Sequence, residues 1–491
     1  MPKSSLFACL LFVGFCSFTV HAELLPARAD SLSSPTLNQK RSIEVFLPKS
    51  EPKDAARRYE TIYVLDGDWN AMLVVHTVDF LQATGFMPPV IVVSVPNFFD
   101  DKGVNSRDRD LTPSSLPNEA RSGGAPQFMA FLKTELIPYV NQHYPTNGVN
   151  IVHGHSYGGL FLNYVIANDP TIFDGYLILD PAMWWEDHAV SKLLAEKLPS
   201  TPTQNKAVFI AGRAGGAYKG MGIDTLEPAY AKAPRAFHRQ ITAYPNESHD
   251  SMKFKGTYDG LRYLYRGWSQ QKVFVGPDDG IFDPSLPVPI QADTDRFDIH
   301  YTTDGSSPTI ESPLMEQSFA VADPATLRMK LIATRSVYDQ DLALNLKRGA
   351  LWKPARTPKG DEKSAFRYAI YAPDQWPRFR GSPTKSGKTD DGDMSKIVSE
   401  DAAGTVDNDY VIPEDGYYVF VLRVSQPARV SLDGRRIIER GDADDRGQRT
   451  FLVPLRAGIH KARCEFRYRK GGQFDLHVFH FKNGSWDNVV K

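Results

Sequence analysis

The chain has 491 residues, which is too long for a single hydrophobic core and suggests roughly two to four domains. Hydrophobic residues make up 42% and charged residues 23%, which is typical of a globular protein and excludes a largely disordered chain. The formal net charge of −1 gives no electrostatic reason to expect nucleic acid or an anionic membrane as a partner.

The first residues have the pattern of a cleavable signal peptide. Lys3 supplies the positive charge, an apolar stretch runs from Leu6 to Val20, and the small residue Ala22 suits a cleavage site. The apolar stretch is too short to predict a membrane-spanning helix. We therefore expect that residues 1–22 are removed and that the mature protein is periplasmic or secreted.

Short apolar runs rich in β-branched residues alternate with segments of helical spacing between residues 40 and 270. This alternation predicts a mostly parallel sheet with helices on both faces, in an α/β domain over residues 23–270. The expected strands are Thr61–Leu65, Val90–Ser94, Val149–Val152, Tyr176–Leu179 and Ala207–Ala211, and the expected helices cover residues 71–84, 125–143, 158–168 and 189–197.

The pattern changes after Trp268, where helical periodicity is lost. Alternating runs such as Phe297–Tyr301, separated by turn residues, predict strands instead. We expect two all-β modules, over residues 275–352 and 365–491, joined by a linker at 353–364 that is rich in proline and charge.

One short motif carries the strongest chemical signal in the chain. Ser156 is the central residue of Gly-x-Ser-x-Gly, from Gly154 to Gly158, between an expected strand and an expected helix. This setting is that of a nucleophile elbow, a tight turn that exposes a serine oxygen at the edge of the sheet. The motif therefore predicts Ser156 as a nucleophile.

A serine nucleophile needs a general base, and in this fold the order along the chain is serine, acid, histidine. His249 lies in a loop between a plausible last strand (Arg239–Ala243) and a helical segment (Tyr258–Trp268), where the fold places its base. His238 lies in or just before that strand and is a poorer candidate. We therefore expect His249 to accept the proton of Ser156.

The residue that orients the base is less constrained by the sequence. Asp224 and Glu227 follow the last of the five expected strands and occupy the expected place for the acid. Glu227 could equally stabilise the start of a helix. Asp180, Glu186 and Asp187 follow the preceding strand and are alternatives. We favour Glu227 or Asp224, without choosing between them.

An ester hydrolase must also stabilise the negative oxygen of its tetrahedral intermediate. One N–H donor is expected from Tyr157, which follows the nucleophile, and a second from the loop after an earlier strand. That loop is Leu65–Trp69, in which Gly67 lets the backbone approach a substrate closely. The second donor is therefore the N–H of Gly67 or Asp68.

Further residues are candidates for the substrate pocket. Trp184 and Trp185 follow an expected strand, and we expect one of them to line the pocket. His155 flanks the elbow and is expected to pack there or line the pocket. Arg107 lies among acidic residues, so an internal ion pair is its first interpretation and contact with a substrate carboxylate the second. The sequence has no metal-site spacing and no cofactor motif, so we expect neither.

Several segments, in order, resemble one known family. The chain over roughly residues 40–268 is similar to the putative-esterase family of α/β-hydrolases, which includes esterase D-like, feruloyl-esterase-like and enterochelin-esterase-like enzymes. The resemblance implies Ser156 as nucleophile and His249 as base. One departure is Asp180-Pro-Ala182, where such enzymes often have Ser-Pro-Ser. The segments that carry the resemblance are Tyr63–Gly67, Arg107–Pro113, Gly154–Gly159, Phe173–Tyr176, Pro181–Glu186 and Glu247–His249.

The two β modules resemble other families. Ile299–Thr309 and Leu331–Arg335 are similar to the small β-sandwich at the C-terminus of chitobiases and β-hexosaminidases. Residues 365–485, with Pro413–Phe420, resemble the protective-antigen-like β-barrel found on many glycan-active enzymes. These resemblances imply a β fold and a glycan context.

Together these features predict a secreted or periplasmic serine carboxylic-ester hydrolase that works through an acyl-enzyme. The β modules favour an esterified glycan, with acetyl or feruloyl groups, as substrate, and polysaccharide binding by the modules themselves. A siderophore-trilactone esterase is the alternative within the same class. A glycan-binding protein with an inactive hydrolase domain is the alternative of another class, against which the intact Ser156 and His249 argue. A glycosidase is less favoured because no pair of catalytic carboxylates stands out.

Overall fold

The structure is a computed structural model that describes residues 27–48, 56–116, 121–200, 206–234, 237–270, 273–316, 318–360, 366–389, 394–441, 448–482 and 485–489. The predicted signal peptide lies outside these residues. The chain divides into two compact units. The α/β unit holds the described residues up to 270 together with Ala333–Asp339, and the β unit holds the described residues 273–332 and 340–489.

The α/β unit is built on one eight-stranded sheet with the strand order β1-β2-β4-β3-β5-β6-β7-β8. Strands β4, β3, β5, β6, β7 and β8 run parallel to their neighbours, and only the edge pairings β1–β2 and β2–β4 are antiparallel. The strands are β1 (Arg28–Ser34), β2 (Gln39–Phe46), β3 (Tyr59–Leu65), β4 (Val90–Val95), β5 (Thr146–His155), β6 (Gly175–Leu179), β7 (Ala207–Arg213) and β8 (His238–Tyr244).

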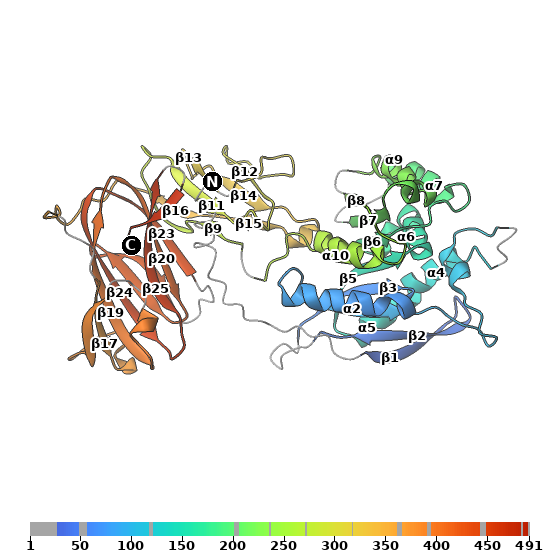
Figure 1. Cartoon of the computed structure of the whole chain (residues 1–491), viewed down its shortest axis with the longest axis horizontal. Coiled ribbons are helices and arrows are strands. Elements are labelled where there is room, and N and C mark those ends of the chain that lie inside the picture. Colours follow the sequence, from blue (N-terminus) through green and yellow to red (C-terminus); the bar gives the residue numbers. More distant parts are fainter. Residues whose placement is uncertain are drawn as a thin grey trace. The chain divides into compact units, whose positions relative to one another are not determined.

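Helices cover both faces of this sheet (Figure 1). Helices α2 and α10 pack on one face, whereas α4, α5, α6, α7 and α9 pack on the other. The helices are α2 (Gly67–Ala83), α3 (Arg107–Leu111), α4 (Ala125–Phe131), α5 (Ile137–His143), α6 (Tyr157–Asn168), α7 (Ala189–Lys197), α8 (Gly216–Gly220), α9 (Leu226–Tyr230) and α10 (Met252–Leu264), and a π-helical turn (Leu132–Leu136) joins α4 to α5.

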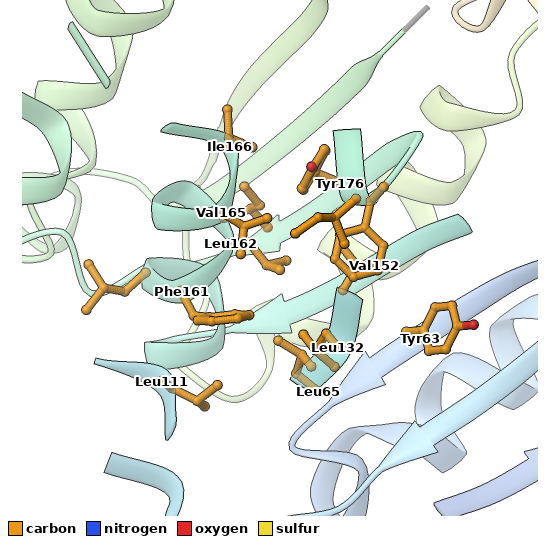
Figure 2. Close-up of a cluster of buried hydrophobic side chains, with 14 of the residues drawn as sticks. Tyr63, Leu65, Leu111, Leu132, Val152, Phe161, Leu162, Val165, Ile166 and Tyr176 are labelled. Atoms are coloured by element: carbon orange, nitrogen blue, oxygen red, sulfur yellow. The ribbon is translucent and has the colours of Figure 1, made fainter. Parts of the chain in front are cut away.

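Alternate residues of the central strands supply two separate cores. Tyr63 and Leu65 of β3 belong to the core under α6, whereas Ile62 and Val64 belong to the core under α2 and α10. Successive side chains of a strand point to opposite faces, so a continuous apolar run is what a sheet covered on both sides requires. Figure 2 shows the first of these cores, with side chains of α6 facing those of the sheet.

The predicted fold class is therefore confirmed for this unit. Each of the five predicted strands lies within an observed strand, and the predicted last strand is β8. The strands are longer than predicted, and β1 and β2 were not expected at all. Within the part of the chain that the structure describes, no helix is long and apolar enough to cross a membrane.

The described residues of the β unit form β-sheets with short 3₁₀ turns, as the sequence predicted for the region after residue 275. Two sheets have three strands each, in the orders β13-β11-β9 and β12-β14-β15, and two have six, in the orders β16-β10-β23-β20-β25-β26 and β18-β17-β19-β24-β21-β22. The strands are β9 (Val275–Gly276), β10 (Asp279–Phe282), β11 (Val288–Ala292), β12 (Ile299–Thr302), β13 (Ser318–Val321), β14 (Arg328–Leu331), β15 (Gln340–Leu342), β16 (Asn345–Arg348), β17 (Phe366–Tyr371), β18 (Lys385–Thr389), β19 (Ala402–Ile412), β20 (Gly416–Val424), β21 (Ala428–Leu432), β22 (Arg435–Arg440), β23 (Gln448–Leu455), β24 (Gly458–Tyr468), β25 (Phe474–Lys482) and β26 (Ser485–Asn488).

The two expected β modules share a sheet. Strand β10 pairs in parallel with β23, and β16 pairs with β10, so strands before residue 352 extend a sheet of the C-terminal region. Side chains from both six-stranded sheets then form one apolar core, which includes Tyr418, Phe420 and Cys464. The predicted linker at 353–364 therefore does not mark a boundary between sheets. The division into two domains at this linker stays a prediction.

The short segment Ala333–Asp339 belongs to the α/β unit although it follows β14 in the chain. Its Arg335 is buried and donates to Glu60 Oε2 at 2.8 Å and to the backbone oxygen of Leu264 at 3.0 Å. Tyr338 donates its hydroxyl hydrogen to the other oxygen of Glu60. The segment therefore ties the start of β3 to the end of α10 through a buried ion pair.

Arg335→Ala is expected to lower the free energy of unfolding by roughly 3–5 kcal/mol, because it leaves the buried Glu60 carboxylate without its cation. Urea denaturation followed by circular dichroism measures this loss. The double variant Glu60→Gln/Arg335→Met removes both charges and should recover a large part of it. A loss below about 1 kcal/mol for Arg335→Ala would show that the ion pair contributes little.

Candidate active site

Ser156 occupies the turn between β5 and α6 in a strained backbone conformation. Its φ is 59° and its ψ is −115°, a region that residues other than glycine rarely adopt. Its N–H donates to the oxygen of Leu179 at 2.9 Å, and its own carbonyl oxygen accepts from Leu160 at 3.0 Å and from Ala182 at 3.1 Å. These bonds hold the partly exposed serine at the carboxyl end of β5, as a nucleophile elbow requires.

The glycines of the motif let the strand and the helix approach closely. A Cβ atom on Gly154 would lie 2.7 Å from the carbonyl carbon and oxygen of Gly158. A Cβ atom on Gly159 would lie 2.9 Å from the Cβ of Pro181. A larger residue at either position would push α6 away from the sheet, and the turn that carries Ser156 would move with it.

Gly154→Ala is therefore expected to destabilise the protein by about 1–3 kcal/mol through overpacking, and to lower activity beyond the loss of folded protein. Thermal melting and the specific activity of the folded fraction measure the two effects. Gly216→Ala is the matched control, since a Cβ atom there meets nothing within 4 Å. Equal behaviour of the two variants would contradict the close approach at the elbow.

His249 is held by a buried carboxylate at the end of the neighbouring strand β6. Its Nδ1 lies 2.6 Å from Asp180 Oδ2. The side chain of Asp180 is fully buried, and it also accepts from Arg213 Nε at 2.6 Å and from the Arg213 backbone N–H at 3.2 Å. A carboxylate on Nδ1 fixes the ring so that Nε2 can accept a proton, which is the arrangement of a catalytic base and its orienting acid.

The surroundings of Asp180 keep its carboxyl ionised. Burial alone would raise the pKa of Asp180, but hydrogen bonds from His249 and Arg213, together with the charge of Arg213, lower the pKa below its ordinary value. The carboxylate therefore stays negative at neutral pH, where it can stabilise the imidazolium that forms when His249 takes a proton.

The structure corrects the predicted acid. Glu227 is exposed on α9 and accepts from the Tyr218 hydroxyl at 2.8 Å, and Asp224 is exposed in a short helical turn. The carboxylate on His249 is Asp180, which had been kept as an alternative. Both β6 and β7 end at the same edge of the sheet, so a position after either strand satisfied the sequence pattern. Asp180 has a φ of 40°, and this turn brings its carboxylate to His249.

His155 packs against His249, which is the first of the two roles expected for it. It is 6% exposed, and its Nε2 lies 2.9 Å from the backbone oxygen of His249. The centres of the two rings are 4.2 Å apart. Burial, together with the nearby His249, lowers the pKa of His155 to about 3, so its ring is neutral at ordinary pH. The contact therefore ties the loop of His249 to the residue that precedes Ser156.

The predicted oxyanion donors lie at the starts of two helices, α2 and α6. Asp66 is in the left-handed conformation, with a φ of 51°, and its carbonyl oxygen accepts the first bonds of α2 from Trp69 and Asn70. The N–H groups of Gly67 and Asp68 therefore have no acceptor within the helix. Tyr157 is the first residue of α6. These are the three donors that the sequence predicted, and their role remains a prediction.

The side of the site beside Tyr157 is aromatic. The ring of Tyr157 lies 6.1 Å from that of Trp184 and 5.6 Å from that of Trp185. Trp184 is 43% exposed, whereas Trp185 is 1% exposed and donates to the Ser114 hydroxyl at 3.1 Å. Of the two predicted pocket residues, Trp184 is thus available to a substrate and Trp185 is part of the core.

Arg107 forms the internal ion pair that was its first interpretation. Its Nε lies 2.7 Å from Asp66 Oδ1, and its Nη2 lies 3.0 Å from Asp66 Oδ2. The guanidinium carbon is 5.3 Å from the ring centre of Trp69 and 5.2 Å from that of Tyr157. The side chain is 14% exposed, so contact with a substrate remains a proposal.

Ser156 follows β5 and Asp180 follows its neighbour β6, so both lie at the carboxyl edge of a mostly parallel sheet, and His249 bonds to Asp180. The chain order serine, aspartate, histidine is the order expected of a serine hydrolase of the α/β-hydrolase type. Over the described ranges of the chain, no group of three or more histidine, cysteine, aspartate or glutamate side chains is placed to hold a metal ion.

Comparison with known proteins finds a family match in each of the two units. Residues 34–250 match the family described as Putative esterase, and residues 288–342 match the family described as Fn3 associated. The first match covers most of the α/β unit, in agreement with its α/β-hydrolase fold. The second match falls within the predicted first β module.

Several of the proteins to which this chain is similar are siderophore esterases. The siderophore enterobactin esterase of Emericella nidulans is 29% identical over 161 residues, which cover 29% of this chain and 52% of that protein. The ferri-bacillibactin esterase BesA of Bacillus subtilis is 26% identical over 193 residues, which cover 36% of this chain and 66% of that protein. The matches thus span about half to two thirds of these relatives.

Among solved structures, an IroE-like serine hydrolase from Shewanella oneidensis is 26% identical to this chain. The match covers 50% of this chain and 82% of that one, with a TM-score of 0.45.

Proposed function

We propose that this protein is a serine carboxylic-ester hydrolase in which Ser156 is the nucleophile, His249 the general base and Asp180 the residue that orients His249. The observation that carries the proposal is the strained Ser156 in its elbow beside a His249 whose Nδ1 bonds to the buried Asp180 at 2.6 Å.

In the first half of the reaction, His249 removes the proton of Ser156 as the serine oxygen attacks the ester carbonyl carbon. The carbonyl oxygen becomes negative and accepts hydrogen bonds from the N–H of Tyr157 and the N–H of Gly67 or Asp68. The tetrahedral intermediate then collapses. The bond to the alcohol oxygen breaks, and the proton on His249 goes to the departing alcohol.

In the second half, a water molecule replaces the alcohol. His249 takes a proton from this water as its oxygen attacks the acyl carbon on Ser156. Collapse of the second tetrahedral intermediate releases the carboxylic acid, and the serine oxygen recovers its proton from His249. Asp180 stays ionised throughout, and its charge favours the imidazolium in both halves.

As the substrate we propose an ester of the siderophore type, which is the alternative substrate in the sequence analysis. The support is that these relatives are named for siderophores, that the exposed Trp184 lies 6.1 Å from Tyr157, and that the exposed Trp69 lies beside Arg107. An acetylated or feruloylated glycan, the first expectation, rests on the resemblances of the β modules alone. Polysaccharide binding by those modules is a separate proposal with the same support.

A panel of esters at equal concentration tests the substrate class. It contains the trilactone enterobactin, a feruloylated xylan and an acetylated xylan, with p-nitrophenyl acetate as the general substrate and the Ser156→Ala variant as the blank. We expect kcat/KM for the trilactone to exceed that for either glycan by at least about 100-fold, which is about 2.7 kcal/mol of discrimination. A preference for a glycan ester would contradict the siderophore proposal and leave the serine mechanism intact.

We also propose that the protein is exported, on the strength of the signal-peptide pattern over residues 1–22. Expression of the full chain followed by N-terminal sequencing should give a mature protein that begins at Glu23. A cytoplasmic product that retains Met1 would contradict the proposal.

A further inference from the structure

Arg107 lies between the two segments that carry the expected oxyanion donors. On one side it makes two parallel hydrogen bonds to Asp66, whose left-handed conformation sets the direction of the next peptide groups, at Gly67 and Asp68. On the other side its guanidinium faces the ring of Tyr157 at 5.2 Å. A single side chain therefore contacts the residues on which both donors depend.

The Asp66 carboxylate is buried close to the first turn of α6. Its side chain is 1% exposed, and Asn97 Nδ2 also donates to its Oδ1 at 3.0 Å. A Cβ atom built on Gly158 would lie 3.6 Å from its Oδ2, so the carboxylate faces the first turn of α6. A negative charge that is buried beside the helix start would oppose the negative oxygen of the tetrahedral intermediate. Arg107 supplies the compensating positive charge.

We propose that Arg107 is a positioning residue for the oxyanion hole: it locks Asp66 in the conformation that presents the Gly67 and Asp68 N–H groups, and it neutralises the Asp66 charge beside Tyr157. The inference rests on the proposed esterase function. It assigns Arg107 a role in every turnover, whatever the charge of the substrate. Direct binding of an anionic substrate would instead affect only substrates that carry a negative charge.

The test uses the full-length protein and p-nitrophenyl acetate, a small neutral ester. Arg107→Gln should lower kcat roughly 10–100-fold and change KM less than about threefold, because the displaced donors act in the transition state. Arg107→Lys keeps the charge but cannot make two parallel bonds, so its kcat should fall between that of Arg107→Gln and that of the unchanged protein. Arg109→Gln, on the same helix α3, removes an equal charge and should stay within about twofold.

The double variant Asp66→Asn/Arg107→Gln separates positioning from substrate binding. Asparagine tolerates the left-handed conformation and removes the buried charge, so the double variant should be at least about fivefold more active than Arg107→Gln alone. Circular dichroism and thermal melting measure the folded fraction of each variant, and kcat is calculated per folded molecule.

Two results would overturn the inference. Unchanged turnover of p-nitrophenyl acetate by Arg107→Gln would show that Arg107 does not act on the oxyanion hole. A double variant no more active than Arg107→Gln would show that the charge of Asp66 is not what Arg107 offsets. If instead Ser156→Ala hydrolyses the ester as fast as the unchanged protein, the proposed esterase function fails, and that outcome is distinct from both.

Discussion

Ser156→Ala is expected to lower the hydrolysis of p-nitrophenyl acetate by roughly 10⁴–10⁶-fold, because no other group can form the acyl-enzyme. The expected effect on folding is small, since alanine removes one oxygen from a partly exposed side chain. Steady-state hydrolysis measures the first effect, and thermal melting measures the second.

The matched control for Ser156→Ala is Ser248→Ala. Ser248 is exposed and lies next to His249 in the loop that carries the base. The activity of Ser248→Ala should stay within a few-fold of that of the unchanged protein, because Ser248 contacts Ser251 and not the reacting atoms. If Ser156→Ala retained more than about a tenth of the activity, the nucleophile would have to be another residue.

Asp180→Asn is expected to lower kcat by about 10³–10⁴-fold. The carboxylate now accepts from His249 and twice from Arg213. The two side chains bond to Oδ2 and the Arg213 backbone N–H bonds to Oδ1. The NH₂ group of an amide would face a donor in place of one of these oxygens, and a neutral amide cannot stabilise the imidazolium of His249 by charge. Asparagine tolerates a φ of 40°, so the backbone can stay in place.

Glu227→Gln and Asp224→Asn are the controls for Asp180→Asn, since they occupy the place where the sequence alone put the acid. Each should keep activity within about twofold, because exposed side chains away from the reacting atoms have small effects. A loss of more than about 100-fold in Glu227→Gln, with Asp180→Asn nearly normal, would reverse the assignment of the acid.

The nucleophile and the base could be predicted because local patterns encode them. An elbow needs glycine at fixed distances from Ser156, and the structure gives the reason: a Cβ on Gly154 would meet Gly158 at 2.7 Å. His249 could be located because it lies in a short loop between a strand and a helix, each with its own periodicity. Both signals lie within about a dozen residues of the side chain concerned.

The acid could not be chosen because the choice depends on two strands that are adjacent only in space. Asp180 ends β6 and Asp224 follows β7, and the sequence does not say which turn faces His249. A residue other than glycine with positive φ, such as Asp180, has no reliable sequence signal. The departure at Asp180-Pro-Ala182 from the Ser-Pro-Ser of similar enzymes is the one sequence feature that marks this position.

Strand β2 and the segment Ala333–Asp339 could not be predicted from the sequence, because both depend on partners far away in the chain. Strand β2 includes Arg41, which is 3% exposed and pairs with Asp110 at 2.8 Å, so a charged residue fills a core position and breaks the apolar pattern. Arg335 does the same far along the chain, where it pairs with Glu60 across 275 residues. Buried ion pairs of this kind become visible only when the partner is known.

The central claim is that His249 and Asp180 activate Ser156, and covalent labelling tests it most directly. The protein is treated with a fluorophosphonate ester, digested, and analysed by peptide mass spectrometry. We expect one label, on Ser156, and labelling slowed by at least about 100-fold in His249→Ala and in Asp180→Asn, since both remove the means of activating the serine. A label on a different residue, or labelling of Ser156 at the same rate in these two variants, would contradict the account.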